Sequence, residues 1–418
     1  MNRQGACVSR PQILVTSLLG QQNRGDWELT LALIDILRQA FPGCSIQGLC
    51  RDSDSAAKHF PGVSFQSLLG VSTRPPGLRR RLESSLSFTF GFVAAAFGIL
   101  TGLCPNALAR SYRRADFIVA APGGYLEDIN LGILMHVAHM WLALLARKPL
   151  LLAPLSVGPL SSAVWRMILA HLLRRVRLIC VREPGSLALV RELLGPDTPH
   201  LHLLPDMALY RNETDSEGGA RLLNDVGLAD RPFVAMTVED GQVPFYAGPA
   251  APPPCHLASL AMFCRLLEAD GLGVFIWLQA ETAGGIAGDE TAMTNFVRQA
   301  PGNVFASRER MSPAVIRGVL QRASALVTRR MHPCLFAIQV GCPFVSLSTE
   351  VKTRAILLML ELDDCVFDFS ACNATALHAR VLDAMRRSEA FHQASVGAAR
   401  LAFRGRQTLL EVLRSSVA

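Results

Sequence analysis

Residues 328–343 of the chain read TRRMHPCLFAIQVGCP. The pattern predicts that an apolar strand ends at Thr328, that a charged loop leads into a short helix, and that a Gly-Cys-Pro turn opens a second strand, Phe344–Leu347. Arg330 and His332 then lie at the carboxyl end of a strand, where open α/β sheets bind ligands. Guanidinium groups bind phosphate or carboxylate through a planar fork of donors, and imidazoles transfer protons near neutral pH. The stretch therefore predicts a site for an anionic substrate that becomes protonated, although a solvated strand cap and a surface histidine would show the same residues.

Strand and helix signals alternate on both sides of this stretch, which predicts two doubly wound, Rossmann-like α/β domains that face a cleft. We expect the first domain over residues 11–209, a polar linker over 210–231 and the second domain over 232–390. A last helix, 391–418, is expected to pack back on the first domain, and residues 51–83 are expected to be mostly loop. The strands are expected at 13–19, 45–49, 115–120, 150–155, 177–181, 202–204, 233–237, 274–278, 304–306, 325–328 and 344–347.

The composition excludes several classes of protein. The chain has 418 residues, of which 50% are hydrophobic and 18% charged, so a large core is expected and extended disorder is not. Its net charge of +7 favours anionic ligands or lipid head groups, but no basic run interleaved with aromatic residues supports nucleic-acid binding. The 11 cysteines lack the spacing of a zinc site, and those in apolar segments, such as Cys180 and Cys264, are expected to be reduced in a cytoplasmic protein.

One apolar insert, residues 84–109, contains no charged side chain. Three arginines at 79–81 precede it, and Arg110, Arg113 and Arg114 follow it. The insert is long enough to span a bilayer, but glycine, serine and threonine dilute its apolar character, and arginines at both ends give no orientation. We therefore expect a helix that is buried in the first domain or lies on the inner face of a membrane.

Two loops in the first half are expected to bind a ligand. In the first loop, Asn23 and Asp26 begin a predicted helix, whose N-terminus favours an anion. In the second, Gly123 and Gly124 allow a ligand to approach the backbone, and Asp128 could accept a proton from a hydroxyl group. Turns followed by helix caps would contain the same residues.

Three more polar residues follow predicted strands. Ser156 ends one strand and would form a wall of the cleft, although a simple loop would also place it there. Arg182 would add a second cation, or would form a surface pair with Glu183. Lys352 follows the strand Phe344–Leu347 and would also face the cleft. These residues extend the predicted anion site across both domains.

The order of these motifs resembles the polysaccharide pyruvyl transferase family over about residues 13–360. Each motif is weak alone, but six in order with sensible spacing form a fairly specific signal. The matching residues are Gly20, Asn23, Gly25 and Asp26; Gly123, Gly124 and Asp128; Ser156, Gly158 and Pro159; Arg182, Glu183 and Ser186; Pro205 and Asp206; and Arg330, His332, Ala337, Gly341, Pro343 and Lys352.

The resemblance implies a GT-B-like fold and an enzyme that moves the enolpyruvyl group of phosphoenolpyruvate onto two hydroxyls of a sugar as a pyruvate ketal. Arg182 and Arg330 would clamp the donor, so that no metal or cofactor would be needed. His332 would protonate the methylene carbon, and Asp128, or else Asp26, would deprotonate a hydroxyl of the acceptor. The acceptor would be a saccharide, either free or lipid-linked, in the synthesis of an exopolysaccharide or a cell-surface glycan.

Two alternatives remain open on the sequence. One is another GT-B enzyme that uses a nucleotide-sugar donor, in which Glu350 would contact the ribose. The other is a catalytically inactive scaffold in polysaccharide assembly. Binding of phosphoenolpyruvate, of a nucleotide or of neither would distinguish the three.

Overall fold

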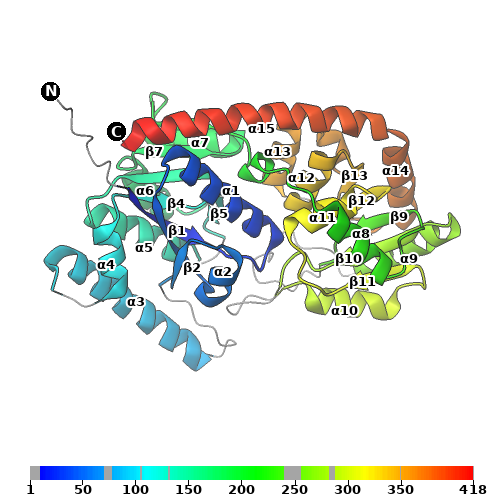
Figure 1. Cartoon of the computed structure of the whole chain (residues 1–418), viewed down its shortest axis with the longest axis horizontal. Helices are drawn as coiled ribbons and strands as arrows, with labels where there is room; N and C mark the ends of the chain where they lie inside the picture. Colours follow the sequence, from blue (N-terminus) through cyan, green and yellow to red (C-terminus); the bar gives the residue numbers. More distant parts are fainter. Residues whose placement is uncertain are drawn as a thin grey trace, which may run out of the picture.

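The computed structural model describes residues 10–69, 78–103, 106–129, 132–239, 256–281, 288–348 and 350–417, with the backbone alone over 78–85. Most of the predicted insert 84–109 lies inside these ranges, whereas residues 104–105 lie outside them. The first half of the chain forms one parallel sheet and the second half another, and Figure 1 shows the two side by side. The predicted α/β architecture of two Rossmann-like sheets is confirmed.

The N-terminal sheet has the strand order β3-β2-β1-β4-β6-β7-β8, and β5 pairs with β6 beside this path. From β1 toward one edge of the sheet the strands are β2 and β3, and toward the other edge they are β4, β6, β7 and β8. The direction in which the chain adds strands therefore reverses between β1 and β4. The strands are β1 (Gln12–Leu18), β2 (Ser45–Cys50), β3 (Ser64–Ser67), β4 (Phe117–Ala120), β5 (Gly123–Leu126), β6 (Leu150–Val157), β7 (Leu178–Val181) and β8 (Leu201–Leu203). The helices are α1 (Arg24–Ala40), α2 (Ser53–His59), α3 (Leu78–Thr101), α4 (Ala107–Arg114), α5 (Gly132–Leu145), α6 (Ala163–Leu173) and α7 (Pro184–Leu194), and the 3-10 helix η1 (Met207–Tyr210) follows.

The C-terminal sheet has the order β11-β10-β9-β12-β13, which reverses between β9 and β12. The strands β9, β10, β12 and β13 are buried along their whole length, as expected for a parallel sheet covered by helices on both faces, whereas the edge strand β11 is only partly buried. The elements are α8 (Ser216–Asp225), β9 (Phe233–Met236), α9 (His256–Ala269), β10 (Gly273–Trp277), α10 (Glu290–Gln299), β11 (Val304–Ser307), α11 (Pro313–Leu320), β12 (Ala325–Thr328), α12 (Met331–Val340), β13 (Phe344–Ser346), α13 (Val351–Met359), η3 (Asp363–Cys365), α14 (Ala374–Arg386) and α15 (Ser388–Val417).

Two segments differ from the sequence-based expectation. Residues 51–83, predicted to be mostly loop, contain α2, β3 and the start of α3. The segment 210–231, predicted to be a linker, contains α8, which packs on α11. Gly219 makes this packing possible, because a side chain there would overlap the backbone of Gly318. Gly219 therefore serves close packing between two helices rather than a flexible linker.

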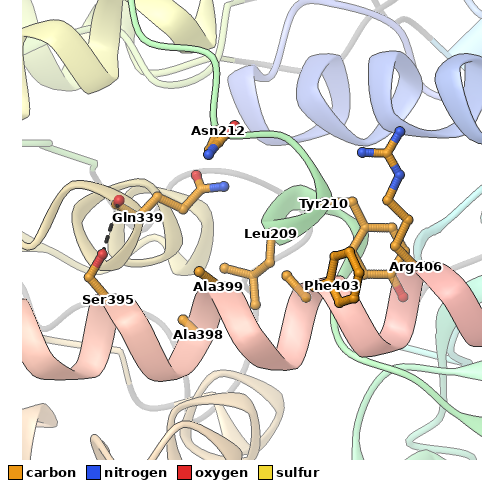
Figure 2. A pocket seen from close by; sticks show the side chains of 10 residues that line it. Leu209, Tyr210, Asn212, Gln339, Ser395, Ala398, Ala399, Phe403 and Arg406 are labelled. Atoms are coloured by element: carbon orange, nitrogen blue, oxygen red, sulfur yellow. Dashed lines mark hydrogen bonds between the residues drawn. The ribbon is translucent and has the colours of Figure 1, made fainter.

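The long helix α15 runs along both halves of the molecule (Figure 1). Arg414 Nε near its end donates to the carbonyl of Ala40 in the first half at 3.2 Å, and Ser395 Oγ donates to the carbonyl of Gln339 in the second half at 3.2 Å. Figure 2 shows the middle of α15 against η1, where Phe403 and other residues line a cavity of about 220 Å³. The helix thus fastens the two halves along one side.

Direct contacts also join the two halves at the start of α1. Asn23 forms an antiparallel bridge with Ala280, and Arg24 donates its backbone N–H to the carbonyl of Gln279 at 3.1 Å. One turn further along α1, the buried Glu28 carboxylate pairs with Arg317 of α11 at 3.2 Å. The N-terminal end of α1 is therefore held against the second sheet by backbone and side chain alike.

Two further expectations concern the membrane and the cysteines. Within the described ranges, no helix is both long and apolar enough to cross a bilayer. Cys180 and Cys264 are buried free thiols, as expected, whereas Cys372 is disulfide-bonded, which the sequence did not indicate.

Candidate functional site

The polar loops at the carboxyl ends of the two sheets meet where α1 touches the second half of the chain. We call this cluster the junction site; it consists of Asp26, Arg51, Gly124, Arg182, His332 and Lys352. Gly124 lies in β5, and the other residues follow β1, β2, β7, β12 and β13; the strands β1 and β12 lie beside the points where strand order reverses. This is the position at which parallel α/β sheets bind ligands.

His332 lies in the first turn of α12 and packs against the first turn of α1. Any side chain at Gly25 would collide with the His332 ring, so the glycine is required for this contact. Burial lowers the pKa of His332 from 6.5 to about 4; Asp206 opposes the shift and Arg182 reinforces it. The ring is therefore neutral at pH 7, and its buried Nε2 has no hydrogen-bond partner among the described residues.

Asp26 lies in the same first turn of α1. Burial raises the pKa of Asp26 from 3.8 to about 6, although Arg182 and Arg51 oppose the shift. Arg51 directly follows β2. Burial lowers the pKa of its guanidinium group, and the nearby Asp26 carboxylate opposes this shift. The Nε of Arg51 is buried without a hydrogen-bond partner in the described part of the chain. Asp26 is thus a carboxyl group that titrates near neutrality, and Arg51 is a nearby cation whose Nε can still donate to a ligand.

Arg182, directly after β7, is held rigidly by two contacts. Its Nε donates to Ser156 Oγ at 2.9 Å, and its Nη1 donates to the Asp206 carboxylate at 2.7 Å. Ser156 in turn donates to Glu183 at 3.0 Å, so every partner of the arginine is itself fixed. The guanidinium group is buried, and its remaining nitrogen, Nη2, points to Gly124. Such an arrangement presents one preoriented donor edge to a ligand.

Gly124 in β5 separates Arg182 from Lys352 of α13. A Cβ at this glycine would lie 3.1 Å from Arg182 Nη2 and 3.8 Å from Lys352 Nζ. The lysine is only loosely paired, at 3.8 Å from Glu127 and 3.6 Å from Glu350. Two cations from different sheets therefore flank a position that has no side chain. Gly123, the other predicted glycine, pairs with Leu155 in the β5–β6 ladder.

Arg330 lies beside this cluster but is occupied by acidic partners. Its Nε lies 2.7 Å from Glu239, and its Nη2 lies 2.5 Å from Asp289. Arg329, the preceding residue, also pairs with Glu239, at 2.8 Å. The charge of Arg330 lowers the pKa of both Asp26 and His332, so the arginine lies near them. Its own guanidinium group, however, is already bound to two carboxylates.

Two predicted site residues accept backbone hydrogen bonds where helices begin. Asn23 is the N-cap of α1 and accepts from the N–H of Gly25 at 2.9 Å. Asp128 accepts from the N–H groups of Ser161 at 3.1 Å and Ser162 at 2.7 Å, just before α6. Burial alone would raise the pKa of Asp128, but these donors outweigh it and lower the pKa. Both carboxamide and carboxylate therefore have structural partners, and Asp128 is poorly suited to accept a proton.

The sequence-based prediction missed Arg51 of the junction site and Glu127, which lies beside it. Glu127, rather than its neighbour Asp128, faces Lys352, and burial raises its pKa while Lys352 opposes. Arg51 has the same signal as Arg182, a cation directly after a buried strand, but it opens the polar stretch that was predicted to be loop. A group of three or more His, Cys, Asp or Glu side chains able to hold a metal ion is absent from the described ranges.

The chemistry that these groups can perform follows from their charges. Arg51, Arg182 and Lys352 can bind a small ligand with two or three negative charges. Asp26 and His332 have pKa values moved in opposite directions, a condition that favours separate roles as acid and base. The junction site is thus suited to proton transfer on a bound anion.

Comparisons with known proteins agree with this picture. The family model described as polysaccharide pyruvyl transferase matches residues 23–350, which include every residue of the junction site except Lys352. No curated protein gives a significant match.

Solved structures show the likeness of the fold. The chain is similar to S. aureus MnaA in a co-structure with UDP, with a TM-score of 0.60, 11% identity and 94% of each chain covered. It is also similar to Anabaena Alr3699/HepE in complex with UDP and glucose, with a TM-score of 0.58, 13% identity, and 96% of this chain and 99% of that chain covered. A putative UDP-N-acetylglucosamine 2-epimerase from Listeria monocytogenes gives a TM-score of 0.59 at 11% identity, with 95% of each chain covered. At these identities the likeness establishes a GT-B-like fold.

Proposed function

Because the chain belongs to the polysaccharide pyruvyl transferase family, we propose that it transfers the enolpyruvyl group of phosphoenolpyruvate to two hydroxyls of a saccharide as a pyruvate ketal. The observation that carries this proposal is the pair of cations, Arg182 Nη2 and Lys352 Nζ, on either side of Gly124. Phosphoenolpyruvate carries a phosphate and a carboxylate on the same carbon skeleton, so two cations from different sheets suit its two charged ends. The product would enter an exopolysaccharide or a cell-surface glycan.

The donor would be bound mainly by groups that still have free donors. Arg182 offers the edge at Nη2, Lys352 is loosely paired, and Arg51 has a buried Nε without a partner among the described residues. Arg330, by contrast, is bound to Glu239 and Asp289, so we assign it an electrostatic effect on the site rather than a direct clamp. With three protein cations at the donor, no metal is required to neutralise its charge.

The proposed reaction moves one proton onto the donor and two from the acceptor. A proton adds to the methylene carbon of phosphoenolpyruvate, and the neighbouring carbon, now cationic, bonds to the first hydroxyl oxygen. The carbon–oxygen bond to phosphate then breaks, and the second hydroxyl oxygen takes its place. Two hydroxyl protons are released, one of which balances the proton gained by the methyl group, and the other leaves with the phosphate.

Asp26 and His332 are suited to these proton transfers. Asp26, with a pKa near 6, keeps a protonated fraction near neutrality and can protonate the methylene carbon. His332 is neutral, and its buried Nε2, which has no partner among the described residues, can accept a hydroxyl proton. This assignment reverses the roles expected on the sequence, because burial keeps His332 unprotonated. Asp128 is replaced in the scheme because its carboxylate accepts hydrogen bonds from the N–H groups of Ser161 and Ser162 just before α6.

A thermal-shift comparison of three ligands tests the proposal. Phosphoenolpyruvate at a hundred times its dissociation constant would stabilise the folded protein by about 2.7 kcal/mol, whereas UDP and UDP-glucose would leave the melting temperature unchanged. A shift with UDP and UDP-glucose alone would support the nucleotide-sugar enzyme, with Glu350 as a candidate contact. No shift with any of the three, together with retained binding to a glycan, would support an inactive scaffold.

A further inference from the structure

Helix α3 exposes an apolar stripe that the donor site does not use. Its members recur every three or four residues, so they lie on one face of the helix, and one more follows directly after the last turn. Their side chains are 55–81% exposed, which is unusual for so many large apolar residues in one helix. We call this set the α3 stripe; it consists of Leu86, Phe90, Val93, Phe97, Leu100 and Leu103.

The opposite face of α3 packs into the hydrophobic core. Ala95 and Ile99 are buried in the apolar cluster of the N-terminal half, and α3 packs against α4 and α5. In Figure 1 the helix lies at the periphery of that half, away from α15. The α3 stripe is therefore the outward face of a helix whose inward face already accounts for its folding.

A basic cavity lies at the end of the same helix. Gly98 and Gly102 of α3 and the three arginines of α4, Arg110, Arg113 and Arg114, line a space of about 210 Å³. Arg113 Nη1 donates to the carbonyl of Ile99 at 3.2 Å, which fixes the arginines beside the C-terminal end of the helix. None of the described residues that line this cavity is acidic. Guanidinium groups gathered in this way bind phosphate.

The residues around the α3 stripe distinguish a lipid partner from a protein helix. Coiled-coil seams are flanked by charged residues that select the partner. Here the sequence has no charged residue between Glu83 and Arg110, and small or hydroxyl residues such as Ser87 and Thr101 flank the stripe. Positive charge is confined to the ends of the segment, as in helices that lie in the head-group region of a bilayer.

We propose that α3 and α4 dock the protein on an anionic bilayer surface. The α3 stripe enters the boundary between head groups and acyl chains, and Arg110, Arg113 and Arg114 bind head-group phosphates. This mode of binding requires no helix that crosses the bilayer, in agreement with the described helices. The inference stands on α3 and α4 alone and does not depend on the identity of the donor.

Vesicle sedimentation of the whole chain tests the docking. Vesicles of phosphatidylcholine with phosphatidylglycerol should bind the protein, and vesicles of phosphatidylcholine alone should bind it several-fold more weakly. Phe90→Ser with Phe97→Ser should weaken binding to the mixed vesicles by about tenfold or more for each phenyl ring. Arg110→Gln with Arg114→Gln should weaken it by about fivefold for each charge and remove most of its salt dependence.

Phe403→Ser is the matched control, because this phenylalanine of α15 is 64% exposed, close to the 69% of Phe90. It should leave vesicle binding unchanged, and circular dichroism of every variant should match the wild type. Failure of the folded wild type to bind mixed vesicles overturns the proposal, as does equal loss of binding in Phe403→Ser. A concentration-dependent dimer in ultracentrifugation that Phe90→Ser with Phe97→Ser abolishes, without any vesicle binding, would assign the stripe to a second copy instead.

Discussion

Replacing Gly124 by alanine should separate donor binding from folding. The new Cβ would lie 3.1 Å from Arg182 Nη2, 3.8 Å from Lys352 Nζ and 3.9 Å from Ser156 Cβ. Only the first distance is tight, and the atom concerned is a side-chain nitrogen rather than backbone. The protein should therefore fold with its stability changed by about 1 kcal/mol or less. The methyl group would instead occupy the space between the two cations.

The loss of affinity can be estimated from the bonds that the methyl group blocks. A hydrogen bond to a charged group contributes about 1.5–3 kcal/mol. Losing one such bond between Arg182 Nη2 and the donor should weaken phosphoenolpyruvate binding by roughly 10- to 150-fold. Isothermal titration of Gly124→Ala and wild type at the same ionic strength measures this ratio, and urea unfolding of both measures the stability.

Gly185→Ala provides the control, because a Cβ at this glycine in the first turn of α7 would meet no atom within 4 Å. It is expected to bind phosphoenolpyruvate as the wild type does. Wild-type affinity in Gly124→Ala would refute the reasoning, since the space beside Arg182 would then not be used by the donor. An equal loss in Gly185→Ala would refute it as well.

Three further variants test the electrostatics of the site and the junction. Between pH 4 and pH 6 the folded state holds the proton of Asp26 more tightly than the unfolded state, so stability falls as the pH rises; Asp26→Asn should remove that fall and raise the melting temperature above pH 6. The pKa of His332 is lowered to about 4, so the stability of the folded protein decreases as the pH falls from 6.5 toward 4. His332→Gln should reduce this decrease in the same melting curves. Arg317→Leu leaves the buried Glu28 without its nearest partner and should cost about 3–5 kcal/mol in urea unfolding, whereas the exposed Arg310→Leu should cost less than about 1 kcal/mol. Two results would contradict these assignments. One is a difference in melting temperature between variant and wild type that does not change with pH. The other is an equal loss of unfolding free energy in Arg317→Leu and Arg310→Leu.

One physical rule predicts from the sequence which polar residues come together. Parallel strands bring their carboxyl ends to one edge, so Arg182, His332 and Lys352 could be expected together although they are far apart in the chain. The same rule applies to Arg51, but the expectation of a loop over residues 51–83 hid it. The short edge strand β3 has only one apolar side chain, Phe65, and a strand with so little hydrophobic pattern gives no signal.

What the sequence could not decide was which polar groups remain free. Asp128 and Glu127 are adjacent, and only the β5–β6 pairing and the hydrogen bond from Ser162 N–H to Asp128 reveal that Glu127 faces Lys352. Arg330 has the sequence signal of a ligand clamp, but its carboxylate partners come from distant loops that no local pattern predicts. The protonation of His332 likewise depends on burial against Gly25, a contact between the two halves of the chain.

The most direct test of the account is calorimetric titration of the wild-type chain with phosphoenolpyruvate, followed by titration with UDP. We expect saturable binding of one phosphoenolpyruvate per chain with a micromolar to millimolar dissociation constant, weakened by added salt because protein cations hold the donor. UDP should give no heat of binding. A folded protein that binds UDP and not phosphoenolpyruvate would contradict the central claim.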